Sequence, residues 1–271
     1  MSDLNTRMPS GSDVTQRTDM KPAFSAHLLE PILQPANILQ AWKRVRANKG
    51  AAGIDGMTID DFPSWAKEGN WKRIMNELRS GQYQPAPVRR VEIDKPDGGK
   101  RQLGIPTIVD RVIQQAIAQV LTPIFDPTFS DNSFGFRPNR NGQQAVKQVQ
   151  SIIKTGRRFT VDVDLSKFFD RVNHDLLMTH LGYKVKDKRL LKLIKRYLRA
   201  GVIDNQFYSE SRGHQFVRYA DDFTILVKSP RAGKRVLSSI SKFLNNRLKL
   251  IVNTVKSHVV KTSESKFLGF T

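Results

Sequence analysis

The sequence contains no cysteine, which excludes disulfide bonds, thiolate nucleophiles and cysteine-based zinc sites together. Its five histidines are scattered without the spacing of a metal-binding motif. No run of residues is apolar enough to span a membrane, and the polar N-terminus lacks the hydrophobic region of a signal peptide. We therefore expect a cytoplasmic protein that has no membrane partner.

Acidic residues are scarce relative to basic ones. The 271 residues include 45 Lys and Arg but only 25 Asp and Glu, a formal net charge of +20. Such an excess favours a polyanionic partner, and nucleic acid is the commonest one. Because non-enzymatic nucleic-acid-binding proteins share this charge, it indicates a class of partner and no particular chemistry.

Two of the few acidic residues stand side by side in an apolar setting. The run Phe-Val-Arg-Tyr-Ala-Asp-Asp-Phe-Thr-Ile-Leu at residues 216–226 has two strand-like segments flanking Asp221 and Asp222. As a hairpin, it would place two mutually repelling carboxylates at its tip, where a more stable turn would have Asn-Gly or Asp-Gly. A divalent cation site explains this arrangement. A solvated acidic turn is the alternative that this segment leaves open.

A third carboxylate follows another predicted strand. At residues 158–165 apolar side chains alternate with polar ones, which is the period of a half-buried strand and puts Asp162 and Asp164 on one face. Asp164 would lie at the end of this strand. Together with the hairpin it would form a site of oxygen ligands only, which favours magnesium or manganese over zinc. The alternative is an edge strand whose polar face lies in water.

The remaining patterns alternate between helix and strand without a regular βαβ repeat, so we expect an α+β fold built on an antiparallel sheet. Residues 1–22 lack periodicity and are expected to form a disordered leader. Helical patterns occur at residues 37–49, 71–78, 107–121, 143–154, 174–181, 187–199 and 231–248. Strand patterns occur at residues 88–94, 100–105, 158–165, 215–227 and 266–271.

Several of these segments, taken in order, resemble the reverse transcriptases encoded by bacterial group II introns. Besides the two aspartate segments, the matching strings lie at residues 45–56, 95–106, 131–138 and 267–270. A lone Tyr-Ala-Asp-Asp is a weak signal, whereas several motifs in the same order are a specific one. The resemblance covers roughly residues 28–271 and implies a right-hand polymerase with fingers and a palm that has an antiparallel sheet.

The resemblance also implies roles for individual residues. Asp164, Asp221 and Asp222 would be catalytic and would bind two Mg2+ ions, with the backbone carbonyl of Leu165 as a further metal ligand. Substrate-binding roles fall to Lys95 and Arg101 at the triphosphate, Phe169 at the ribose 2′ position and Lys256 at the pyrophosphate. Core packing for Phe169 and a solvated surface for Lys95 and Lys256 are the structural alternatives. Two arginines, Arg137 and Arg140, would touch the template backbone, whereas Asp162 and Asp170 would be structural.

The implied activity is RNA-directed DNA synthesis by two-metal nucleotidyl transfer. The implied partners are an RNA template, the intron RNA, a DNA primer and deoxynucleoside triphosphates. A non-catalytic RNA-binding remnant of an intron-encoded protein is the alternative, and a metal-dependent nuclease is a third possibility that the ordered polymerase motifs disfavour.

The sequence departs from this family between residues 208 and 216. A Gln-Gly-Gly-Pro-Leu-Ser-Pro type motif and a long helix are expected there, and neither is present. We therefore predict an internally deleted, C-terminally truncated member of the family without thumb, maturase or endonuclease domains. The predicted domains are an N-terminal extension with fingers at residues 23–157 and an incomplete palm at residues 158–271.

Overall fold

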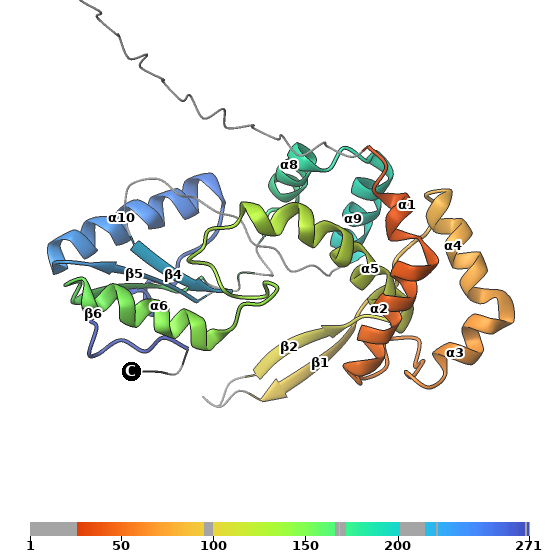
Figure 1. Ribbon diagram of the computed structural model, residues 1–271, viewed down its shortest axis with the longest axis horizontal. Coiled ribbons are helices and arrows are strands. Elements are labelled where there is room, and N and C mark those ends of the chain that lie inside the picture. Colours follow the sequence, from red (N-terminus) through yellow and green to blue (C-terminus); the bar gives the residue numbers. More distant parts are fainter. Residues whose placement is uncertain are drawn as a thin grey trace, which may run out of the picture.

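In the computed structural model the chain forms two lobes that lie side by side (Figure 1). The structure describes residues 26–94, 100–165, 168, 172–200, 215–220, 222–268 and 270, with Arg101 and Gln215 described by their backbone alone. We call the lobe with most of the helices the helical lobe and the other one the sheet lobe. Neither is continuous in sequence, because the chain enters the sheet lobe after α5 and returns to the helical lobe for α8 and α9.

The helical lobe contains seven α-helices and a β-hairpin among the described residues. The helices are α1 (Leu29–Ile32), α2 (Pro35–Ala47), α3 (Phe62–Trp65), α4 (Trp71–Arg79), α5 (Ile108–Phe125), α8 (His174–Lys184) and α9 (Lys188–Ala200). A π-helical turn, η1 (Ala66–Asn70), joins α3 to α4, and β1 (Arg89–Asp94) pairs with β2 (Lys100–Ile105). The two strands project from the lobe as an antiparallel hairpin (Figure 1).

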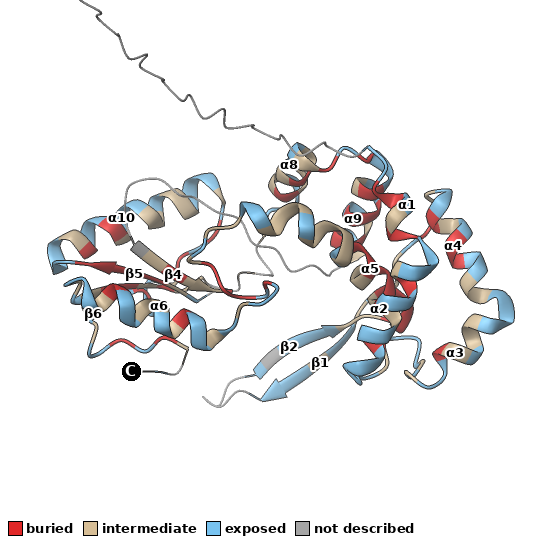
Figure 2. Ribbon diagram, in the orientation of Figure 1, coloured by how far each residue is buried: buried red, intermediate tan, exposed pale blue. Residues whose placement is uncertain are grey.

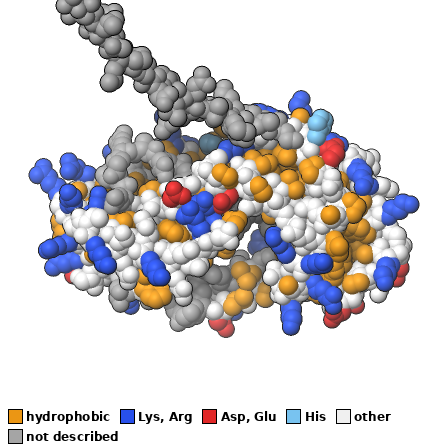
Figure 3. All heavy atoms as spheres, viewed as in Figure 1, with side chains coloured by type: hydrophobic (Ala, Val, Ile, Leu, Met, Phe, Trp, Pro, Cys, Tyr) orange, Lys and Arg blue, Asp and Glu red, His pale blue; other side chains and the backbone are white. Residues whose placement is uncertain are grey.

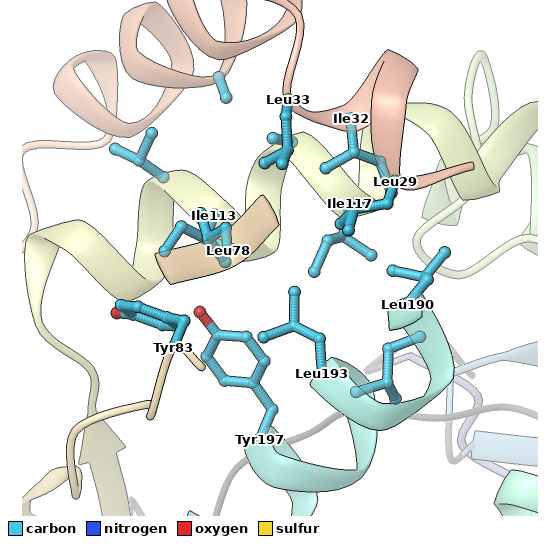
Figure 4. Close-up of a cluster of buried hydrophobic side chains, with 14 of the residues drawn as sticks. Leu29, Ile32, Leu33, Leu78, Tyr83, Ile113, Ile117, Leu190, Leu193 and Tyr197 are labelled. Atoms are coloured by element: carbon cyan, nitrogen blue, oxygen red, sulfur yellow. The ribbon is translucent and has the colours of Figure 1, made fainter. Parts of the chain in front are cut away.

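One continuous hydrophobic core holds the helical lobe together, with α5 at its centre. Ile108, Val112, Ile113 and Ala116 of α5 have no exposed surface, and side chains of α1, α2, α4, α8 and α9 pack around the same core. Figure 2 shows the buried residues along these helices, and Figure 4 shows the side chains between α1, α5 and α9. The predicted helix at residues 107–121 is confirmed as α5, and the Thr107 side chain caps it by accepting a hydrogen bond from the Asp110 backbone N–H.

A buried carboxylate crosslinks this core. Asp110 is 1% exposed, and its Oδ1 accepts hydrogen bonds from the hydroxyls of Tyr83 at 2.8 Å and Tyr197 at 3.0 Å. Its Oδ2 accepts from the Thr107 hydroxyl at 2.8 Å and from the Ala86 backbone N–H at 3.1 Å. Burial, and then the charge of Asp110, raises the pKa of both tyrosines well above the ordinary value of 10.0, so both keep their protons.

The sheet lobe is built on four antiparallel strands in the order β4-β5-β3-β6. These are β3 (Phe159–Val163), β4 (Gln215–Tyr219), β5 (Asp222–Val227) and β6 (His258–Lys261). Helix α10 (Pro230–Arg247) covers one face, against the side chains of Val161, Val163 and Ile225. Helix α6 (Gly142–Lys154) packs against β4 on the other face, where Val217 and Leu226 are buried (Figure 1). A 3-10 turn, η2 (Asp126–Thr128), follows α5 where the two lobes meet.

The expected α+β class with antiparallel sheets is confirmed. Two details differ from the prediction. Helix α2 begins at Pro35, two residues before the predicted start at residue 37, and the side-chain amide of Asn37 donates to the carbonyls of Ile32 and Ala116. Instead of a strand at 266–271, the described residues there form one bridge between Phe267 and Phe270, and the strand that completes the sheet is β6.

Three other expectations concern the chain as a whole. The expected leader, residues 1–22, lies outside the described residues. The division at residue 157 stays a prediction about function and differs from the lobe boundary, since α8 and α9 join the core of the helical lobe. No helix among the residues that the structure describes is long and apolar enough to cross a membrane.

Candidate active site

The candidate site lies at one end of the sheet, where two strands each present a carboxylate. The antiparallel register of β3 and β5 pairs Val163 with Phe223. Asp164 directly follows the β3 residue of this last pair and Asp222 directly precedes its β5 partner, so both aspartates lie at this end of the sheet. Neighbouring strands lie about 4.8 Å apart, so two like charges meet at this edge. The register therefore leaves Asp164 and the start of β5 at the same end of the sheet, and the shared cation site stays a prediction.

The hairpin turn between β4 and β5 is tight. Tyr219 pairs with Asp222, so only two residues separate the paired strand ends, and Ala220 is a turn residue. Ala220 adopts a φ of 56°, a left-handed conformation that costs an L-residue about 1–2 kcal/mol. Asp221 itself lies outside the described residues. Turn strain of this kind is found where surrounding structure over-determines the backbone, which happens at functional sites.

The segment at residues 132–135 supplies that surrounding structure. Its Phe134 N–H donates to the Arg218 carbonyl and the Arg218 N–H donates to the Asn132 carbonyl, both at 2.9 Å, so this segment runs along β4. The Arg218 side chain in turn donates from Nε to the Ala220 carbonyl at 2.6 Å. A Cβ on Gly135 would lie 2.2 Å from the Ala220 backbone nitrogen, so only glycine fits under the turn.

Two residues that were not expected at the site, Asn253 and Ser257, position Asp164. Asn253 donates from Nδ2 to Asp164 Oδ2 at 3.0 Å, and its backbone N–H donates to the Asp164 carbonyl at 2.8 Å. The Ser257 hydroxyl accepts from the Asp164 backbone N–H at 3.0 Å. Through Oδ1, Asn253 also accepts from the N–H groups of Val255 and Lys256. Asn253 itself was the available signal, since the Asn side chain commonly accepts hydrogen bonds from the backbone two residues on in a turn.

Asp162 shares the face of Asp164 but has different partners. It accepts hydrogen bonds from the hydroxyls of Thr224 and Ser265, the latter at 2.9 Å, and His258 Nε2 lies 3.8 Å from its Oδ2. Both of its oxygens are therefore engaged within the sheet lobe. These contacts agree with the structural role expected for Asp162.

The structure describes only some of the other predicted site residues. Leu165 forms a bridge with Val252 immediately after Asp164, and Lys256 is exposed in the turn that Asn253 caps. The backbone of Arg101 pairs with Ile93 in the β1–β2 hairpin, and its side chain is not described. Outside the described residues lie Lys95, Phe169, Asp170 and Asp221.

Arg137 does not face a template, contrary to our expectation. Its side chain is 6% exposed. All five of its N–H groups have acceptors: Asp126 receives three hydrogen bonds, two at its carboxylate and one at its carbonyl, and the carbonyls of Ser130 and Ser133 receive the others. No donor remains for a phosphate. Arg140 is also engaged, with Asp131 and over the ring of Phe134, although it keeps 24% of its side-chain surface exposed.

The chemistry of the described donors suits a hard divalent cation. Asp164 and Asp222 supply carboxylate oxygens at adjacent positions, and Leu165 follows directly with a carbonyl. No group of three His, Cys, Asp or Glu side chains gathers among the described residues, a set that lacks Asp221. The opposing pair and the carbonyl fit the group that the sequence predicts at this edge.

Comparison with known proteins agrees with this arrangement. The profile of the reverse transcriptase (RNA-dependent DNA polymerase) family matches residues 93–215 and 201–271. The match thus comes in two pieces, which overlap at residues 201–215, between β3 and β5. The group II intron-encoded protein LtrA of Lactococcus lactis is 37% identical over 183 residues, which are 66% of this chain and 30% of LtrA. Protein YkfC of Escherichia coli is 36% identical over 184 residues, 65% of this chain and 48% of YkfC.

A yeast relative, the putative COX1/OXI3 intron 2 protein of Saccharomyces cerevisiae, matches over a longer range, with 26% identity over 257 residues. These residues are 93% of this chain and 28% of the relative. The chain thus spans less than half the length of each of these relatives. Since the family profile covers more than half of the chain, the chain belongs to the reverse transcriptase (RNA-dependent DNA polymerase) family, with group II intron-encoded proteins among its relatives.

Proposed function

We propose that the chain is an RNA-directed DNA polymerase of the group II intron type, in which the sheet lobe acts as the palm. The observation that supports this most directly is the meeting of Asp164 and Asp222 at one sheet edge in a chain of this family. Two carboxylates from neighbouring strands repel each other unless cations lie between them. The partners would be an RNA template, a DNA primer and deoxynucleoside triphosphates, with the intron RNA as a further ligand.

The residues would divide the work by position. Asp164, Asp221 and Asp222, with the Leu165 carbonyl, would hold two Mg2+ ions, which when bound supply charge neutralisation for phosphoryl transfer. Asn253 positions Asp164 by fixing one carboxylate oxygen. Because Gly135 has no side chain, the segment at residues 132–135 can pack directly against the Ala220 backbone and so position the β4–β5 turn.

Substrate binding would come from groups around this edge. Lys95 and Arg101 of the β1–β2 hairpin segment would bind the triphosphate, since Arg offers paired donors and Lys a point charge. Phe169 would contact the sugar where a ribose carries its 2′-hydroxyl. Lys256 is exposed three residues from Asn253 and would neutralise the released pyrophosphate.

Primer extension tests the proposal. Wild-type protein should extend a DNA primer on an RNA template with deoxynucleotides and Mg2+, and Asp222→Asn should reduce the rate by roughly 10³-fold or more, as removal of charge at a transition-state site does. The matched control is Asp60→Asn, an exposed aspartate in the helical lobe, which should leave the rate unchanged. Equal extension by both variants would contradict the proposal.

Metal binding gives a second readout that does not depend on synthesis. Titration with Mn2+, followed by electron paramagnetic resonance, should show bound ions in the wild type and weaker binding in Asp222→Asn. Unchanged Mn2+ binding in this variant would show that the opposing carboxylates are no cation site.

A second candidate function is RNA binding without synthesis. It is favoured by the division of the family match at residues 201–215, where the expected motif and helix are missing from the sequence. The net charge of +20 would hold RNA through its phosphates in either case. Folded protein that binds RNA, binds Mn2+ and shows no extension would support this candidate over the polymerase.

A further inference from the structure

Strands β3 and β5 have negatively charged residues at one end and positively charged residues at the other. Asp164 and Asp222 flank the last pair of the register, Val163 with Phe223. At the other end, Arg158 and Lys228 flank the pair of Phe159 with Val227. On the other side of β3, Phe159 pairs with Lys261 of β6. Three neighbouring chain segments therefore each bring a cation to the same end of the sheet.

More cations surround this end. We call it the basic end and define it by the described residues Lys154, Arg157, Arg158, Lys228, Arg231, Lys234, Arg235 and Lys261. Except for Arg157, which is partly exposed, all of these residues are exposed. In the three segments that contain them, residues 154–158, 228–235 and 261–264, Glu264 is the single acidic residue. Figure 3 shows Lys and Arg side chains gathered at the end of the sheet lobe that lies away from the helical lobe.

The basic end works against the stability of the fold. Like charges directly opposite each other on neighbouring strands are destabilising, which applies to Arg158 and Lys228. Helix α10 begins with Arg231, Lys234 and Arg235 near its first turn, with no acidic residue there, although the N-terminus of a helix favours negative charge. None of the basic-end side chains forms an ion pair within the part of the chain that the structure describes.

An external polyanion resolves both conflicts at once. We infer that the basic end is a docking surface for the phosphate backbone of a structured RNA, separate from the place of synthesis. The choice of RNA as the ligand rests on the proposed function. The existence of the basic surface rests only on the positions of its Lys and Arg residues. Lys228 lies six residues along β5 from Asp222, about 20 Å at 3.4 Å per residue, so the two ends contact different nucleotides.

Binding of a blunt RNA hairpin tests the inference, because such a probe has a duplex but no template overhang. The triple variant Arg158→Gln/Lys228→Gln/Lys261→Gln should lower affinity about tenfold or more at 150 mM salt and reduce the salt slope of log K by about 2–3, since each lost phosphate contact removes about one unit. The matched control Lys43→Gln/Lys72→Gln/Arg79→Gln removes the same charge from exposed positions of α2 and α4.

Three outcomes would overturn the inference. Equal losses in the two triple variants would mean that net charge alone is responsible. Unchanged RNA affinity in the basic-end variant would leave the cluster without an RNA role. Tighter binding of a DNA duplex than of the RNA hairpin would show a different occupant. Circular dichroism and thermal melting should confirm that both variants are folded.

Primer extension separates this inference from the proposed function. With a short primer–template at saturating concentration and low salt, the basic-end variant should extend as fast as the wild type. If the basic-end variant loses both extension and RNA-hairpin binding, the basic end also contacts the primer–template. This result would overturn the inference that it is separate from the place of synthesis. If the wild type shows no extension, the hairpin measurement still tests the docking surface.

Discussion

The two lobes of the protein place a carboxylate in opposite environments, one buried and one exposed. In the helical lobe, Asp110 is enclosed by one large core and receives four hydrogen bonds through its carboxylate. The sheet lobe has two smaller hydrophobic layers, one on each face of the sheet, and leaves Asp222 exposed at the end of the strands. A buried carboxylate with four hydrogen bonds stabilises a fold, whereas an exposed carboxylate at a strand end is accessible to a cation.

The comparison can be measured lobe by lobe. All three tryptophans, Trp42, Trp65 and Trp71, lie in α2, α3 and α4, so tryptophan fluorescence reports on the helical lobe. Hydrogen exchange of peptides from β3, β4 and β5 reports on the sheet lobe.

The largest effect on stability is expected for Asp110→Ala. This change leaves two buried tyrosine hydroxyls without their acceptor and should lower the free energy of unfolding by about 3–5 kcal/mol. Urea denaturation followed by tryptophan fluorescence measures the loss. The exposed Asp175→Ala in α8 is the control. A loss below 1 kcal/mol would mean that the helical lobe does not depend on its buried carboxylate.

Gly135→Ala should affect the sheet lobe instead. The added methyl group would meet the Ala220 backbone at 2.2 Å, so the hairpin must move, at a cost of about 2–3 kcal/mol. Faster exchange in β4 and β5, with an unchanged fluorescence transition, is the expected result. Gly182→Ala in α8 is matched, because nothing lies within 4 Å of its new methyl group. Equal behaviour of the two variants would refute the role of Gly135.

A smaller change in stability, about 1 kcal/mol, is expected for Asn253→Ala, which removes one hydrogen bond to Asp164. Primer extension should fall about 10- to 100-fold, as it does when a residue that orients a metal ligand is lost. Mn2+ affinity should weaken in the same variant. The exposed Asn246→Ala on α10 should change neither quantity. If Asn253→Ala keeps its Mn2+ affinity while extension falls, Asn253 does not act by positioning Asp164.

The smallest effect at neutral pH, and a growing one in alkali, concerns the two buried tyrosines. Their raised pKa keeps them protonated in the fold, whereas unfolded tyrosines titrate near the ordinary value of 10.0. Stability from these groups is therefore complete below pH 10 and lost above it, by up to about 1.4 kcal/mol per pH unit for each tyrosine. Urea midpoints by tryptophan fluorescence between pH 8 and 11 should fall less steeply in Tyr83→Phe/Tyr197→Phe than in the wild type.

Local periodicity explains what the sequence could predict. The alternation at residues 158–165 and the strand patterns around Asp222 are signals within single segments, and they were enough to predict β3, β4 and β5. Helix α5 was likewise visible from the helical pattern at residues 107–121.

Contacts between distant segments could not be read in this way. Tyr197 and Asp110 are 87 residues apart, and Asn253 and Asp164 are 89 apart, so no window of sequence contains both partners. Strand β6 was missed because its four residues, His258–Lys261, are too short to show a period. Arg137 was misread because a basic residue in a nucleic-acid-binding chain looks the same whether its donors are free or used.

Arg137 has a mechanical consequence for the whole molecule. Asp126 follows the last residue of α5 and so belongs to the rigid helical lobe, whereas Ser133 forms a bridge with Arg218 of β4 in the sheet lobe. One guanidinium bonds to both. The planar group therefore ties the end of the longest helix of one lobe to the segment that runs along β4 of the other. A relative displacement of these two segments would have to break hydrogen bonds of Arg137, so this side chain resists shear between the lobes.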